Sequence, residues 1–259
     1  MDSVAAKEAT AERSAATGRF RDIGVAVGAR QGPQPLVSRY DPVVNYFGHA
    51  AVASWSGPAE HDAAAARALG AMLPDFCGMC GARVAAADEA PVASGIALHH
   101  ATDAAFHGLP VVTGLMRELD ERLDRAGCAR GPRRAASHIG VELLLDGVLV
   151  DEPGYRAAYL AGLGHRPALR WRDADGEPRF AVLIERLRAR GVPDDLRQPE
   201  AIAVRVQRVL AHRPLLAPSA SDAAVIRDAL VGFQPRVEVA AETILRALRA
   251  ALAAAAAQA

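Results

Sequence analysis

Apolar side chains recur along most of this chain at intervals of three and four residues, the spacing that lines one face of an α-helix. Segments with this pattern predict helices over residues 43–55, 60–73, 91–106, 111–125, 181–190, 199–211, 221–231 and 235–252. A further helix is expected to open at Gly131-Pro132, and a short one to follow Pro153. No convincing set of alternating strands stands out in the sequence. The predicted fold is therefore all-α, a helical bundle.

Proline marks several of the predicted helix boundaries. Asp41 can cap a helix whose first position is Pro42, since proline has no N–H to leave unpaired there. Pro74 is expected to end the second helix and to leave Asp75 at its C-terminal mouth. The polar run over 173–176 is interpreted either as part of a hairpin or as a loop.

The chain divides into three parts by composition. Residues 1–38 mix small and charged side chains and end in a proline-containing stretch, so we expect a weakly ordered, flexible extension. Residues 39–252 hold the predicted helices and should form a single domain, because 259 residues with 51% hydrophobic content can bury a substantial core. Residues 253–259 are an alanine-rich tail.

The charge and hydrophobicity of the chain bear on whether it binds nucleic acid or membranes. The formal net charge is +0 and the pI is near 7.1, so the chain lacks the global positive field that marks nucleic-acid binders. Its first residues lack the apolar core of a signal peptide, and no apolar run is long enough to span a bilayer. We therefore expect a cytoplasmic protein that binds neither nucleic acid nor membranes.

The candidate chemistry lies in a sparse series of metal-competent side chains on or beside the predicted helices. They are His49, Asp75, His99, Asp103, Glu142 and Asp146. Two pairs in this series, one beginning at His99 and one at Glu142, are spaced by four residues, so each pair shares a helix face. Imidazole and carboxylate ligands together suit Mn, Fe, Zn or Mg ions that activate water. The sequence thus predicts a divalent-metal site at which these side chains converge.

Two carboxylates of the series are difficult to interpret as surface groups. Glu142 and Asp146 lie among leucines, and a buried carboxylate needs a cation near it. That cation is either a metal ion or a neighbouring arginine, for which Arg133 and Arg134 are the candidates. Glu142 can be a metal ligand or an acceptor that orients an imidazole.

Structural interpretations compete with the metal hypothesis at other positions. Asp75 can simply cap the turn that follows the proline before it. Asp103 can be a charge on a helix surface, since its spacing from His99 is its main support. His107 and His138 are expected to serve structure rather than catalysis.

Several short motifs follow one another in a recognisable order. They are Asn45-Tyr46-Phe47-Gly48-His49, Leu69–Phe76, Gly95–Asp103, Arg133-Arg134 followed by Glu142 and Asp146, Val209–Pro214, and Phe233–Arg236. This order resembles that of the acyl carrier protein phosphodiesterase family, whose members are helical and related to the HD-type metal phosphohydrolases. The likeness covers about residues 43–250.

The resemblance implies an HD-domain-like bundle and a specific reaction. The reaction is cleavage of 4'-phosphopantetheine from a serine of holo acyl carrier protein, which gives the apo form. The implied cofactor is a divalent metal, Mn first with Mg or Fe as alternatives, and the implied partner is the acidic carrier protein. The implied metal ligands are His49, His99, Asp103, Glu142 and Asp146, with Asp75 as base or further ligand and Arg133 and Arg134 as phosphate-binding groups.

The chain also departs from the family pattern. Glu142 replaces the first of two aspartates, and Gly147 stands where a histidine usually follows the second. Two alternatives therefore stay open. One is an HD-like phosphohydrolase of another phosphoester, and the other is a non-catalytic carrier-binding or scaffold protein with the same fold.

Overall fold

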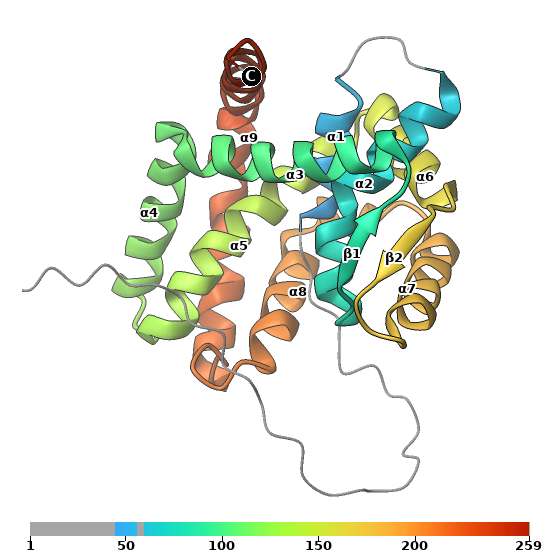
Figure 1. The fold of residues 1–259 in the computed structure, drawn as a ribbon. Helices are drawn as coiled ribbons and strands as arrows, with labels where there is room; N and C mark the ends of the chain where they lie inside the picture. The colour runs from blue at the N-terminus through green and yellow to red at the C-terminus, as the bar shows by residue number, and fades with distance from the viewer. Residues whose placement is uncertain (1–44, 56–59, 259) are drawn as a thin grey trace, which may run out of the picture. The chain divides into compact units, whose positions relative to one another are not determined.

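The computed structural model describes residues 45–55 and 60–258, which belong to one compact unit. These residues are helical apart from turns and one two-stranded sheet, which confirms the predicted all-α class (Figure 1). The extension predicted over 1–38 and the cap predicted at Asp41 lie outside the described residues. None of the described helices has the length and apolarity needed to cross a membrane.

The elements follow one another as a run of helices interrupted by two short strands. In chain order they are α1 (Tyr46–Ala53), α2 (His61–Cys80), β1 (Val84–Ala87), α3 (Ala90–Gly108), α4 (Pro110–Arg125), α5 (Arg130–Leu149), α6 (Pro153–Gly164), β2 (Leu169–Trp171), α7 (Gly176–Arg190), the 3₁₀ helix η1 (Asp194–Arg197), α8 (Pro199–Ala211) and α9 (Ala220–Ala256). Helix α8 has its predicted bounds, and α3, α4 and α5 each begin one residue before the predicted start.

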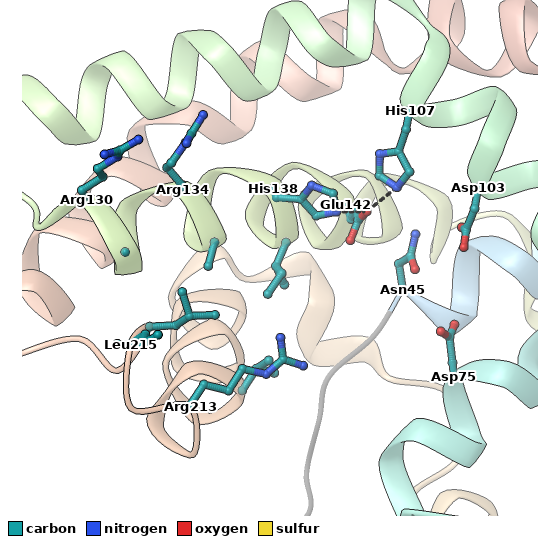
Figure 2. Close-up of a pocket in the computed structure, with 15 residues that line it drawn as sticks. Asn45, Asp75, Asp103, His107, Arg130, Arg134, His138, Glu142, Arg213 and Leu215 are labelled. Carbon is teal, nitrogen blue, oxygen red and sulfur yellow. Dashed lines mark ion pairs between the residues drawn. The ribbon is translucent and has the colours of Figure 1, made fainter. Parts of the chain in front are cut away.

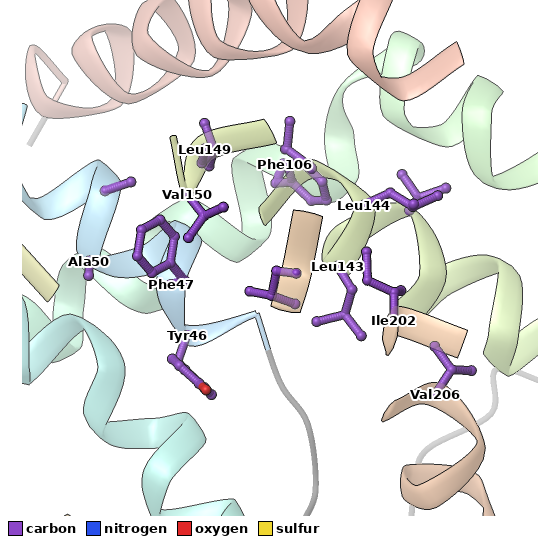
Figure 3. Close-up of a cluster of buried hydrophobic side chains, with 14 of the residues drawn as sticks. Tyr46, Phe47, Ala50, Phe106, Leu143, Leu144, Leu149, Val150, Ile202 and Val206 are labelled. Carbon is purple, nitrogen blue, oxygen red and sulfur yellow. The ribbon is translucent and has the colours of Figure 1, made fainter. Parts of the chain in front are cut away.

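Helix α5 lies at the centre of the bundle and contacts α1, α4, α8 and α9. Its Leu143 and Leu144 are each 1% exposed. They belong to a core cluster that also takes side chains from α1, α3 and α8, among them Phe47, Phe106 and Ile202 (Figure 3). Burying a side chain of this size stabilises a fold by about 1.5–3 kcal/mol. The core thereby fixes the helix that carries Glu142 and Asp146.

Helices α2 and α3 pack with their backbones in close approach. A Cβ atom at Gly70 would lie 2.2 Å from the carbonyl oxygen of Val92. A Cβ atom at Gly95 would lie 2.3 Å from the carbonyl oxygen of Arg67. Glycine is therefore required at both positions, and the approach brings the α2 backbone within reach of His99, one turn after Gly95.

The prediction that Pro74 ends the second helix is wrong. Helix α2 continues to Cys80 and ends where Gly81 adopts a φ of 65°. An interior proline removes one backbone hydrogen bond and costs about 3 kcal/mol. Leu73 and Phe76 are fully buried beside it, as α2 packs against α1, α3 and α6, and their burial offsets that loss. Asp75 therefore lies inside a helix.

The two C-terminal helices predicted over 221–231 and 235–252 are also one element, α9. Pro235 lies in its interior, and the buried Phe233 and Val237 on either side hold the helix against the core. The helix runs to Ala256, so most of the predicted alanine-rich tail is helical. Tertiary packing outweighs the local effect of proline here as it does in α2.

Strands β1 and β2 form an antiparallel pair that the sequence did not predict. Val84 lies opposite Trp171 and Ala87 opposite Leu169. Residues 173–175 lie in the turn between β2 and α7, and Gly176 begins α7, so the loop interpretation is confirmed and the local hairpin is wrong. Strands of 4 and 3 residues give too little alternation to be recognised along the chain.

Replacing Gly95 by alanine is expected to destabilise the protein by about 2–4 kcal/mol, because a methyl group does not fit against the Arg67 carbonyl unless α2 and α3 separate. Urea unfolding followed by circular dichroism measures the change. The matched control is Gly114→Ala on α4, where an added methyl group has no atom within 4 Å. That control should be neutral or stabilise by up to about 1 kcal/mol. Equal stabilities of the two variants would contradict the packing constraint.

Candidate metal centre

Four of the six predicted metal-competent side chains meet between α1, α2 and α3. His49 Nε2 lies 3.2 Å from one oxygen of Asp103, and His99 Nε2 lies 3.3 Å from the other. The two imidazole rings stack with their centroids 4.0 Å apart. Asp75 Oδ2 is 3.9 Å from His49 Nε2. We call His49, His99 and Asp103, with Asp75 beside them, the inner cluster.

The close approach of α2 and α3 orients His99. Its Nδ1 lies 2.9 Å from the carbonyl oxygen of Ala71 on α2, to which Nδ1–H donates. This bond fixes Nδ1 as a donor, so Nε2 faces Asp103. Burial acts to lower the pKa of His99, but the contact with Asp103 outweighs it and raises that pKa. A histidine that binds a metal through one nitrogen usually has its other nitrogen held in this way.

His49 is the least satisfied polar group of the inner cluster. It is 2% exposed, and neither ring nitrogen makes a hydrogen bond of good geometry with the described residues. Burial lowers the pKa of His49, so the ring is neutral and carries a free lone pair. A buried imidazole without a well-formed hydrogen bond is costly, and a bound cation would supply the missing interaction.

The two carboxylates of the inner cluster differ in charge state. Burial acts to raise the pKa of Asp103, but contacts with His49 and His99 outweigh it and hold that pKa well below its ordinary value. Burial raises the pKa of Asp75 to about 7, and the nearby Asp103 and Glu142 add to the shift. Asp103 is thus a fixed anion, whereas Asp75 exchanges its proton near neutral pH.

Glu142 belongs to a second cluster, which the sequence did not predict. Its Oε1 lies 3.4 Å from Nε2 of His107 at the end of α3 and 3.1 Å from Nε2 of His138 on α5. The two rings stack with their centroids 4.7 Å apart. We call His107, His138 and Glu142 the outer cluster. The spacing of four between His138 and Glu142 was visible in the sequence, but only the tertiary structure brings His107 to them.

A cavity of about 830 Å³ connects the two clusters. Its lining includes Asp75, Asp103 and the whole outer cluster, and it continues to three arginines (Figure 2). These are Arg130, Arg134 and Arg213. None of the three makes an ion pair with another described residue, so their charges remain available to an anionic ligand.

Two predicted site residues, Arg133 and Asp146, lie outside the cavity and both clusters. Arg133, predicted to bind phosphate, pairs with Asp120 and Asp124 and does not line the cavity. Arg134 alone of that pair lines it, and neither arginine pairs with Glu142. Asp146 joins neither cluster.

Asp146 is 2% exposed and lies against the backbone of Gly48, where a Cβ atom would come within 2.8 Å of its Oδ1. Burial, reinforced by the charge of Glu142, raises the pKa of Asp146 well above its ordinary value. The shift favours the protonated acid, and a protonated Asp146 needs neither a metal ion nor an arginine beside it.

Gly147, where the resembling family has a histidine, is a packing contact in this protein. A Cβ atom there would lie 2.3 Å from the carbonyl oxygen of Leu196 in η1. Helix α5 and η1 contact each other at this point, so a side chain of any size would push them apart. The missing histidine is thus accompanied by a backbone arrangement that has no room for it.

In metal-free protein, the contribution of Asp75 to stability should fall as the pH rises from about 4 to about 7. The folded protein holds the Asp75 proton with a pKa of about 7, against an ordinary value of 3.8, so this proton is bound more tightly in the folded state throughout that window. Asp75→Asn removes the effect and should be roughly 1–4 kcal/mol more stable than wild type at pH 7.5. Denaturant unfolding of chelator-treated protein across this pH range tests it, and parallel curves for the two proteins would contradict it.

The substitution Gly147→His is expected to destabilise the protein by about 3 kcal/mol or more, because the ring must displace the Leu196 backbone. Gly147→Ala should show a smaller loss, of roughly 1–3 kcal/mol, although alanine favours helix. Thermal unfolding ranks the three proteins. A Gly147→His variant as stable as wild type would show that the contact can relax.

Comparison with protein-family models, with curated proteins and with solved structures finds no match for this chain. What bears on its function is the chemistry of the two clusters and of the cavity that joins them.

Proposed function

We propose that the protein is a metal-dependent phosphodiesterase that uses the inner cluster to hold a divalent cation. The observation that carries the proposal is the buried His49, which makes no hydrogen bond of good geometry among the described residues. It lies beside His99 and Asp103, and Asp103 lines an arginine-containing cavity. Mn is the first choice of ion, with Mg or Fe as alternatives. When bound, such an ion would activate water and neutralise charge on phosphoryl oxygens.

The ligand set fits such an ion chemically. His49 offers a neutral imidazole nitrogen, His99 presents Nε2 toward the same carboxylate, and Asp103 offers a negative charge between them. The ligand atoms of these three residues lie within 4.8 Å of one another, as ligands of one ion must. Asp103 is 42% exposed at its side chain, so the cluster is open to the cavity.

Asp75 is suited to transfer the proton of the attacking water. A general base works best when its pKa is close to the working pH, and burial brings the pKa of Asp75 to about 7. Its carboxylate lines the same cavity as Asp103. Burial also favours the neutral carboxylic acid that Asp75 becomes once it has accepted a proton from water.

The three cavity arginines are suited to hold the ester. A guanidinium group pairs with two phosphoryl oxygens at once, and Arg134 and Arg213 are free of other ion pairs among the described residues. Figure 2 shows the arginines on the side of the cavity away from Asp75 and Asp103. A substrate with a phosphate at the clusters and further negative charge beyond it would interact with both the clusters and the arginines.

The resemblance of the motif order gives the finer proposal. The substrate would be holo acyl carrier protein, and the bond that breaks would be the phosphodiester between 4'-phosphopantetheine and the carrier serine. The acidic surface of a carrier protein is the kind of further negative charge that the arginines would bind. The site would act in the same way on another phosphodiester with an anionic neighbour.

Incubation of holo acyl carrier protein with the purified protein and Mn²⁺ tests the proposal, since loss of the prosthetic group changes the mass of the carrier. Asp75→Asn should slow the reaction by about 100-fold or more, and Asp103→Asn should abolish it. The matched control is Asp62→Asn, which changes an exposed carboxylate of the same helix and should have no effect.

Three outcomes separate the candidate functions. Mass loss that depends on Asp75 and Asp103 supports the carrier reaction. Hydrolysis of a simple diester such as bis(p-nitrophenyl) phosphate, with the carrier intact, supports a phosphohydrolase of another substrate. Absence of both activities, with the carrier bound but unchanged, would favour the non-catalytic scaffold.

A further inference from the structure

The outer cluster is not required by the proposed function, and its geometry calls for a separate explanation. His107 and His138 come from different helices, yet both direct Nε2 at the same oxygen of Glu142, at 3.4 and 3.1 Å (Figure 2). No hydrogen bond holds either ring in place through Nδ1 within the described ranges 45–55 and 60–258. Neither histidine has a role in the motif order described above.

These spacings match those between ligands of one metal ion. Nitrogen and oxygen ligands about 2.0–2.2 Å from an ion in tetrahedral or octahedral arrangement lie roughly 2.9–3.6 Å from one another. Both measured separations fall in that range, and one ligand atom from each of the three residues lies within 4.8 Å of the others. Two imidazoles and one carboxylate are a common ligand set for Zn and for Fe or Mn.

A purely structural ion pair explains the arrangement less well. The side chain of His138 is 50% exposed and that of His107 is 36% exposed, and ion pairs of exposed groups contribute about 0–1 kcal/mol. Two charged imidazoles would also repel each other at a ring separation of 4.7 Å. The same exposure, in contrast, gives an ion a path from solvent to the buried Glu142.

The surrounding charge favours a second cation. Asp75, Asp103 and Glu142 all line the one cavity, so a single divalent ion at the inner cluster leaves Glu142 to be neutralised by other means. The arginines lining the cavity do not pair with Glu142. In the view of Figure 2 the outer cluster lies between Asp103 and Arg134.

We infer that His107, His138 and Glu142 bind a second divalent transition-metal ion, so that the cavity holds two separate metal sites. Three protein ligands leave coordination positions that face the cavity, where an anionic oxygen of a ligand can bind. The second site concerns metal binding and does not depend on whether the protein hydrolyses a phosphodiester.

Titration of the untagged, metal-free full-length protein with Co²⁺ at pH 7.5 tests the inference, with visible absorbance and equilibrium dialysis as readouts. Wild type should bind two equivalents. The double variant His107→Ala/His138→Ala should bind one, because it keeps the inner cluster. Glu142→Gln, which preserves shape but removes the charge, should weaken the second equivalent at least about 10-fold. His61→Ala, an exposed histidine outside both clusters, is the control and should bind two.

The complementary variant is Asp103→Asn, which should lose the inner equivalent and retain the outer one. Circular dichroism confirms that each variant is folded, and the exposure of His107 and His138 makes their replacement tolerable. Binding of one equivalent by wild type, unchanged in the double variant, would overturn the inference. A single equivalent lost in both the double variant and Asp103→Asn would overturn it too, since one ion would then be shared.

These results are separable from the proposed function. Binding of two equivalents of Co²⁺ by a protein that shows no hydrolysis would support the second site and reject the phosphodiesterase. The opposite result is one bound equivalent together with hydrolysis that is lost in Asp103→Asn and unchanged in the double variant. It would support the phosphodiesterase and reject the second site.

Discussion

The close approach of α2 and α3 is the constraint on which the candidate site depends. Gly70 and Gly95 remove the side chains that would keep the two backbones apart. Only at that separation does the Ala71 carbonyl reach His99 Nδ1, which turns the other ring nitrogen toward Asp103. The inner cluster is therefore built by backbone packing first, and its histidine is oriented as a consequence.

Burial and neighbouring histidines shift the pKa values of three aspartates in different directions. The histidine contacts hold the pKa of Asp103 well below its ordinary value, burial brings the pKa of Asp75 to about 7, and burial raises the pKa of Asp146 well above its ordinary value. Similar carboxyl groups thus differ in their affinity for a proton because their surroundings differ. The arginines that line the cavity lie on the side away from Asp75 and Asp103, so the two sides of the cavity differ in charge (Figure 2).

The spacing of apolar residues predicted helices well where the local helix propensity of a segment agrees with its packing in the fold. The bounds of α8 and the starts of α3, α4 and α5 follow from apolar spacing and from proline at the first turn. The errors at Pro74 and Pro235 have one cause, which is that buried neighbours hold a helix together where its local sequence would interrupt it. The strand pair was missed because each strand is short and its partner is distant along the chain.

The sequence by itself determined the all-α class and the residue types of the inner cluster, since periodicity and spacing by four are local properties. Only the tertiary structure decided which side chains share a centre. It grouped Glu142 with His107 and His138, placed Asp146 in neither cluster and engaged Arg133 with Asp120 and Asp124. These assignments depend on contacts between helices far apart along the chain, and such contacts leave no periodic trace in the order of the residues.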